Sequence, residues 1–405
     1  MIYDVMKAFA FSQVDTLILR DPTGHGFLHG LLILAVAWGC WVSYVWAANA
    51  LRADVGIFRG LHFVALVALT LLGLTLPLAF SGTGLHLRAV VFIASYAVIR
   101  LSSAVIVLIT NGPAARKRAA VVAAATLCNA TLIALSAYQS RTAQILVWCA
   151  ALAVEITATL VFCRAWQIRC AERFAERFGF IVTAGLEISL GRMAYGMLGQ
   201  PVGRSQVILI ASTMLLIVVL WWYYFDLLSR YTRHRLDQAG GSQRTHIAVI
   251  SYSLLHLAVI AAMLLIALAM RTMGNDISAS GAGLLGLPLK PVWTASLAGG
   301  FALYTLAIAA MWRSLGQPFR WVHLAGAAGA LLLMPVLAGR PAVAAVLAIG
   351  LLALAVGLIQ QAVGRRQRSA LLDLLENGRA DSEGRPAVRG HSVEASALHH
   401  EIHAR

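Results

Sequence analysis

Charge is scarce in this sequence, and acidic charge is scarcest. Only 12% of the 405 residues are charged, and Asp and Glu together number 17. A soluble globular domain carries about 25% charged residues. Hydrophobic residues make up 60% of the chain, and no stretch before residue 364 is long and polar enough for a soluble domain. The composition predicts one membrane domain over residues 1–363 and a short cytoplasmic, disordered tail over 364–405.

Cysteine pairs and catalytic motifs are also lacking. The five cysteines form no CxxC pair, which indicates neither a disulfide framework nor a zinc site. The N-terminus has no basic n-region and no small-residue cleavage site, so we expect no cleaved signal peptide. No phosphate-binding, nucleophile-elbow or zinc-protease motif stands where it would have meaning. We expect no cofactor, no metal and no catalytic residue, and an enzyme is the less favoured class.

Apolar runs of membrane-spanning length are abundant instead. A spanning helix needs about 20 apolar residues. The first candidate is the weakest because it contains Asp4, Lys7 and Asp15. The sequence predicts an all-α polytopic membrane protein with about twelve transmembrane helices. These are residues 2–19, 27–50, 58–80, 87–110, 117–138, 143–165, 176–198, 206–228, 247–270, 293–313, 320–338 and 341–363.

The basic residues between the runs orient the chain. The net charge is +15, and Lys and Arg lie between apolar runs, which is typical of topology signals rather than of nucleic-acid binding. Loops after even-numbered spans, with the start of the tail, contain 18 Lys and Arg residues, whereas loops after odd-numbered spans contain 7. This bias predicts that both termini are cytoplasmic. The longest internal loop is expected at 271–292.

A faint internal repeat divides the spans into two sets of six. The aromatic stretch at 38–44 resembles the stretch at 220–226, and Tyr96 and Tyr304 occupy comparable places two spans later. Halves with an even number of spans would lie parallel, related by an axis along the membrane normal. We consider halves at 1–170 and 171–363. A chance likeness of aromatic composition is the alternative.

Ionisable groups at membrane depth are candidates for a substrate or ion path. Arg100 is too central to reach water, so we expect it to pair with Glu155 or Glu187 inside the bundle. A structural ion pair and a titrating Glu in a proton or cation path are both open readings. Asp15 is expected at the outer interface. His256 is expected to be a packed core residue, although it remains a path candidate.

A second set of candidates lies near the cytoplasmic ends of the spans. Glu176 starts one predicted span, Asp226 ends the next, and Asp4 starts the first. Together they could form an acidic vestibule with aromatic walls, provided by Trp221, Trp222 and Tyr224. The alternative is that each carboxylate caps a helix or pairs with a loop arginine, such as Arg177 or Arg230.

The tail offers one further pattern. A short helix is possible at 368–376, and the rest is expected to be disordered. His399 and His403 are four residues apart and could share a metal on a helix. A solvated polar end is the favoured reading.

Several of these segments together resemble the bacterial low temperature requirement A family. Residues 176–179 read Glu-Arg-Phe-Gly, and residues 220–226 contain the family's Leu-Trp-Trp-x-Tyr-Phe-Asp. Residues 1–6 match the end of the family's opening helix, whose leading Glu would precede Met1. Glu187 stands one place early relative to the family's Leu-Gly-Glu-Ser. Further matches are Ser12-Gln13, the Trp-rich stretch 38–49, and Tyr252 with His256.

The resemblance implies a bacterial inner-membrane protein linked by name to growth in the cold, and it supplies no substrate. Three functions are open. The first is a secondary transporter of a small molecule or ion, with proton or cation coupling. The second is a membrane sensor or regulatory scaffold for cold or lipid state, and the third is an intramembrane lipid-modifying enzyme. Membrane lipids are the expected partners, and nucleic acid is not one.

Overall fold

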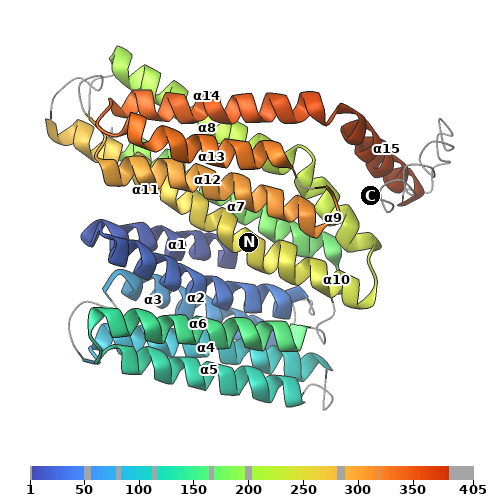
Figure 1. Ribbon diagram of the computed structural model, residues 1–405. Helices are drawn as coiled ribbons and strands as arrows, with labels where there is room; N and C mark the ends of the chain where they lie inside the picture. Colours follow the sequence, from blue (N-terminus) through green and yellow to red (C-terminus); the bar gives the residue numbers. More distant parts are fainter. Residues whose placement is uncertain are drawn as a thin grey trace.

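The structure is a computed structural model, and it describes residues 2–49, 56–78, 84–111, 116–163, 168–196, 203–280, 288–318 and 320–382. Within these ranges the chain is all-α, with one isolated bridge between Pro288 and Pro341. The long helices run roughly alongside one another (Figure 1).

The first helix group is formed by α1–α6, drawn from blue to teal in Figure 1. Apolar residues dominate most of these helices, and turn residues separate them. Their bounds are α1 (Ile2–Arg20), α2 (Gly24–Asn49), α3 (Ile57–Thr75), a short 3₁₀ turn (Leu76–Leu78), α4 (Leu87–Asn111), α5 (Arg116–Ser136) and α6 (Arg141–Cys163).

The second helix group is formed by α7–α14, drawn from green to orange. Its bounds are α7 (Ala171–Gly196), α8 (Arg204–Phe225), α9 (Leu228–Gln238), α10 (Gly241–Ile247), a π-helix (Ala248–Leu254), α11 (Leu255–Ser280), α12 (Pro291–Ser314), α13 (Trp321–Leu337) and α14 (Ala342–Val363). A last helix, α15 (Arg365–Ser382), extends beyond the end of α14 on the side of α9.

Nine helical segments in the described residues are long and apolar enough to cross a membrane. The chain is therefore a polytopic membrane protein, as predicted. Each of the twelve predicted spans overlaps a helix, but α1 and α7 are not among the nine because their charged residues lower their hydropathy, and α13 is shorter, at 17 residues. The number twelve stays a prediction.

Three expectations about the connections were wrong. Residues 271–280, predicted as loop, continue α11, because no proline interrupts the helical pattern there. The stretch 229–238, also predicted as loop, belongs to α9, and the buried Leu228, Tyr231 and Leu236 give that helix an apolar face. The tail helix is longer than 368–376, since it runs from Arg365 to Ser382. Its Leu371 and Leu375, one turn apart, are both buried.

The two helix groups pack in a similar order. In the first group, α3 contacts α4, α4 contacts α5, and α5 contacts α6. In the second group, α11 contacts α12, α12 contacts α13, and α13 contacts α14. Likewise α1 packs on α3 and α7 on α11, while α2 packs on α6 and α8 on α14. The groups meet where α1 and α2 contact α7 and α11. We call this contact the seam.

Candidate functional site

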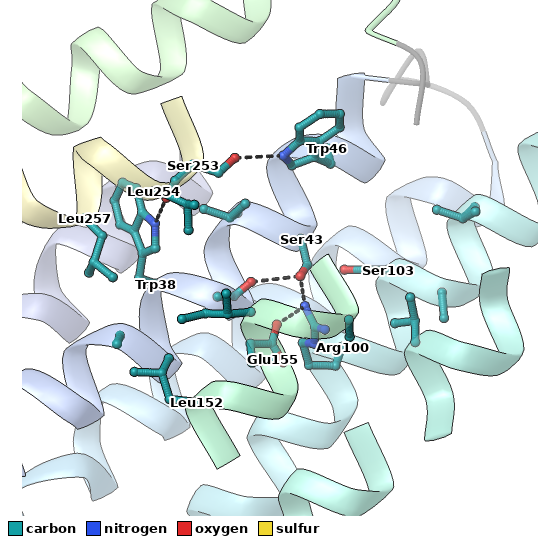
Figure 2. A pocket seen from close by; sticks show the side chains of 18 residues that line it. Trp38, Ser43, Trp46, Arg100, Ser103, Leu152, Glu155, Ser253, Leu254 and Leu257 are labelled. Atoms are coloured by element: carbon teal, nitrogen blue, oxygen red, sulfur yellow. Dashed lines mark hydrogen bonds and ion pairs between the residues drawn. The ribbon is translucent and has the colours of Figure 1, made fainter. Parts of the chain in front are cut away.

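A cavity of about 90 Å³ lies at the seam, and we call it the seam cavity (Figure 2). Its lining comes from α2, α4, α5 and α6 of the first group and, on the opposite side, from the π-helix and α11 of the second. The lining is mostly apolar, with a few polar groups that converge on one side. Its main polar and aromatic members are Trp38, Ser43, Trp46, Arg100, Ser103, Glu155 and Ser253.

An ion pair stands in the wall of this cavity. Arg100 Nη1 of α4 lies 2.8 Å from Glu155 Oε1 of α6, and the two residues are 4% and 6% exposed. Arg100 also donates to Ser43 Oγ of α2, which in turn donates to the carbonyl of Gly39 at 2.8 Å. Figure 2 shows the three polar side chains meeting from their three helices. The expected intramembrane pairing of Arg100 is thus present, with Glu155 and not with Glu187.

The second oxygen of Glu155 is held from the other side. Glu155 Oε2 accepts hydrogen bonds from Tyr96 Oη and from Asn129 Nδ2, both at 3.2 Å. Asn129 Nδ2 also lies 3.0 Å from Tyr96 Oη, so α4, α5 and α6 are tied together around one carboxylate. Arg100 Nε has no hydrogen-bond partner among the described residues. The guanidinium therefore keeps an unused donor, and Asn129 Oδ1 is likewise buried without a partner among the described residues.

The opposite wall is shaped by the π-helix, whose wider turn frees backbone groups from the i→i−4 ladder. Trp38 Nε1 donates to the carbonyl of Ser253 at 2.6 Å, and Trp46 Nε1 donates to Ser253 Oγ at 3.1 Å. Both bonds cross the seam (Figure 2). The π-helix of the second group is thus hydrogen-bonded to Trp38 and Trp46 of the first group.

His256 lies just behind that wall and is fully buried. Its Nδ1 lies 2.7 Å from the carbonyl of Ser251 in the π-helix, and its Nε2 lies 2.7 Å from Tyr224 Oη of α8. Its ring stacks on Tyr252 with 5.3 Å between centroids. Both ring nitrogens have partners, which agrees with the expectation of a packed core residue.

Asp15 lies in the protein interior, and its expected place at the outer interface stays a prediction. It is 1% exposed, because α1 packs between α7 and α11 at the seam. Its carboxylate binds Arg192 of α7 at 3.1 Å and Arg271 of α11 at 2.9 Å. These two arginines are distant in sequence from Asp15 and from each other, so periodicity within one helix could not indicate the cluster.

The predicted acidic vestibule does not assemble as expected. Asp226 pairs with Arg368 of α15, whose pKa is raised by the hydrogen bonds to that carboxylate. Glu176 is exposed, and Tyr224 is buried against His256. The alternative reading of a structural ion pair holds for Asp226, although its partner is Arg368 and neither Arg177 nor Arg230.

The other candidates lie apart from one another. Glu187 is exposed on α7, and Trp221 is 48% exposed, as an outward-facing aromatic residue would be. Trp222 lines a second cavity together with Asp226. Asp4 falls within α1, but its side chain is outside the described residues, as are His399 and His403.

Three polar residues in or beside the lining of the seam cavity, Ser43, Asn129 and Ser253, were missed by sequence reasoning. These residues carry no charge, so the search for ionisable groups at membrane depth passed over them. The available signal was a single polar residue in an apolar run, which is weak because serine is common in membrane helices. Within the described residues no group of three or more His, Cys, Asp or Glu side chains could hold a metal.

Comparison with known proteins places the chain in a family. No curated protein and no solved structure matches it significantly. The family model described as bacterial low temperature requirement A protein (LtrA) matches residues 1–359, which is most of the chain and includes every helix from α1 to α13. The chain therefore belongs to the bacterial low temperature requirement A protein family.

Proposed function

We propose that the protein is a secondary transporter of the bacterial inner membrane and that its solute binds in the seam cavity. The observation that carries the proposal is the Arg100–Glu155 pair, which is buried at membrane depth and borders a cavity between two helix groups. Ionisable residues in such places mark substrate and ion paths in many transporters. The packing order shared by the two groups supports halves at 1–170 and 171–363 that could move against each other at the seam.

Charge neutrality suggests which solute and which coupling ion the site would accept. Arg100 and Glu155 together carry no net charge, and an unbalanced charge in this low-dielectric position would cost several kcal/mol. An anionic group can therefore bind Arg100 only when Glu155 takes up a proton. A metal cation is less favoured, because Arg100 already occupies one oxygen of Glu155 while Tyr96 and Asn129 occupy the other. The site favours symport of one proton with one anionic group.

Both termini are proposed to be cytoplasmic, with twelve helices crossing the membrane. The support is the distribution of 18 basic residues against 7 between alternate connections. Reporter fusions at Arg405 and within residues 281–287 should report opposite sides. Matching reports would contradict the twelve-span topology.

The transport proposal can be tested with the purified protein in liposomes. A pH gradient, acidic outside, is imposed, and proton entry is followed with a trapped pH dye while small carboxylates and phosphate are added one at a time. The parent should show solute-dependent proton entry. Glu155→Gln should lose it but keep solute exchange without a gradient, because the neutral amide mimics the protonated carboxyl.

Glu187→Gln is the matched control, since it removes an exposed carboxylate from α7, outside the cavity. It should behave as the parent does. Proton entry at the parental rate in Glu155→Gln, or no solute-dependent proton entry in the parent, would contradict the proposal.

A further inference from the structure

A second cavity, of about 60 Å³, lies at one end of the second helix group, and we call it the end cavity. It is formed where α8, α12 and α14 end and where α13 begins. Asp226 and Arg368 also line it, and their side chains are 25% and 30% exposed, so the cavity is accessible from that side.

The lining contains a cation without a counter-charge. Arg320 stacks on Trp312, with its guanidinium carbon 4.0 Å from the ring centroid. No carboxylate among the described residues lies within ion-pair distance of it, and its buried Nε has no hydrogen-bond partner there. The one carboxylate of the cavity, Asp226, is already bound to Arg368 by both of its oxygens. The lining therefore carries a net positive charge.

An unpartnered polar atom stands beside this cation. His323 lies in the first turn of α13 and is 3% exposed, and its Nδ1 has no hydrogen-bond partner among the described residues. Its ring is fixed edge-on to Tyr223 with centroids 5.3 Å apart. A buried polar atom without a partner is destabilising, so in a folded protein it commonly has a ligand or water to bind. The N-terminal end of a helix adds a favourable potential for an anion.

We propose that the end cavity is a binding site for a phosphate group, held by Arg320 and His323 with the amide of Gln360 beside them. Phosphate suits this set because a guanidinium can bind two of its oxygens at once while a third accepts from the imidazole. The volume is large enough for several water molecules or one group of comparable size. Asp226 would keep Arg368 in place at the mouth.

The depth of the site points to a phospholipid headgroup as the source of that phosphate. Trp321, next to Arg320, is 71% exposed at the start of α13, and exposed tryptophans at helix ends mark the headgroup level of a membrane. Free phosphate has the same chemistry and could enter from the water. The two sources are separable by experiment.

The test measures the thermal midpoint of the delipidated protein in detergent during titration with phosphatidylglycerol or with inorganic phosphate. Phosphatidylglycerol should raise the midpoint of the parent with saturation. Arg320→Gln should weaken the apparent affinity at least tenfold, and His323→Phe should weaken it less. Arg313→Gln is the matched control, because it removes an exposed arginine from the end of α12, outside the cavity. It should leave the affinity unchanged.

A response to the lipid alone would identify a headgroup site, and an equal response to inorganic phosphate would identify a site for the free ion. Equal loss in Arg320→Gln and Arg313→Gln would overturn the proposal, since it would show only a general attraction of basic residues to anions. Saturable binding by an Arg320→Gln protein with the parental affinity would overturn it as well. Comparison of the ligand-free melting curves of all variants shows whether each is folded.

Discussion

Arg100 is buried and Arg320 is partly buried, and the two are held in opposite ways. Arg100 faces a carboxylate at 2.8 Å, and that carboxylate is itself bonded to Tyr96 and Asn129. Arg320 has an aromatic ring and no ion-pair partner among the described residues, and the carboxylate of its cavity is bound to Arg368. The first site is electrically complete without a ligand, whereas the second is not.

The presence or absence of a paired carboxylate determines how each site can bind an ion. A neutral pair can bind an ion only by exchanging a partner, which suits a transport cycle in which binding must be reversible and coupled to a proton. An unmatched cation attracts an anion continuously, which suits a resident lipid or a regulatory ligand. Removing one residue at a time should reveal this contrast as a graded series of effects on stability.

The largest effect is expected at Arg100. Arg100→Leu leaves Glu155 buried without its cation, and breaking a buried pair in this way costs about 3–5 kcal/mol. The double variant Arg100→Leu/Glu155→Gln should recover a large part of that loss, because no unpaired charge remains. Thermal melting in detergent measures both. A single variant as stable as the parent would show that Arg100 is solvated, and the contrast with Arg320 would then disappear.

Asp15→Asn should have the next largest effect. It leaves Arg192 and Arg271 without their shared carboxylate, but these side chains are 25% and 23% exposed and can be partly solvated by water or headgroups. We expect a loss of about 2 kcal/mol, as for a hydrogen-bonded charge. Ser12→Ala is a useful control, because Arg192 binds the backbone carbonyl of Ser12, which that change retains. A loss as large as that of Arg100→Leu would show that the cluster is as dry as the seam cavity.

A smaller effect is expected at Asp226. Its pair with Arg368 is partly exposed, so Asp226→Asn should cost at most about 1 kcal/mol of global stability. The local effect should be clearer, because Arg368 is the contact between α15 and the end of α8. Limited trypsin digestion should cleave α15 faster in Asp226→Asn. Glu172→Gln, which removes the exposed pair with Arg233, should not change the cleavage rate.

The smallest effect on stability is expected at Arg320 in the absence of phosphate. Arg320→Gln removes a poorly solvated cation, which should stabilise the fold, and one cation–π contact, whose loss should destabilise it. We expect the free energy of unfolding to stay within about 1 kcal/mol of the parent. A loss of several kcal/mol in the lipid-free protein would mean that Arg320 is already satisfied, which would contradict the comparison of the two sites.

Much of the helical layout could be predicted, because the solvent of a membrane protein imposes a simple rule. Apolar runs of about 20 residues must be helical in lipid, since every backbone polar group must be satisfied internally. The predicted spans accordingly overlap the observed helices. The helical stretches 229–238 and 271–280 were missed, and the tail helix was expected only at 368–376, because these segments lie outside the apolar runs, where hydropathy gives no signal.

The candidate site was predictable only in part. Arg100 and Glu155 stood out because each is a charge in an apolar run. The cost of an unpaired buried charge predicted a carboxylate partner for Arg100 but did not decide between Glu155 and Glu187. The two arginine partners of Asp15 were not predicted, because they lie on α7 and α11, which pack on α1. The predicted vestibule does not form around Asp226 because that carboxylate binds Arg368 of α15, a contact that hydropathy does not indicate.

The sequence by itself determined that this chain is helical, crosses a membrane several times, belongs to its family and carries few charges at depth. These properties depend on composition and on runs of apolar residues. A bilayer requires such runs to be helical, because it offers the backbone no water to bond. Only the tertiary structure decided which charges meet. The partner of Arg100 lies 55 residues away in the sequence, and the partner of Asp226 lies 142 residues away. The two partners of Asp15 lie 177 and 256 residues away. Such contacts depend on how the helices rotate and pack against one another, and no spacing within a single helix records that.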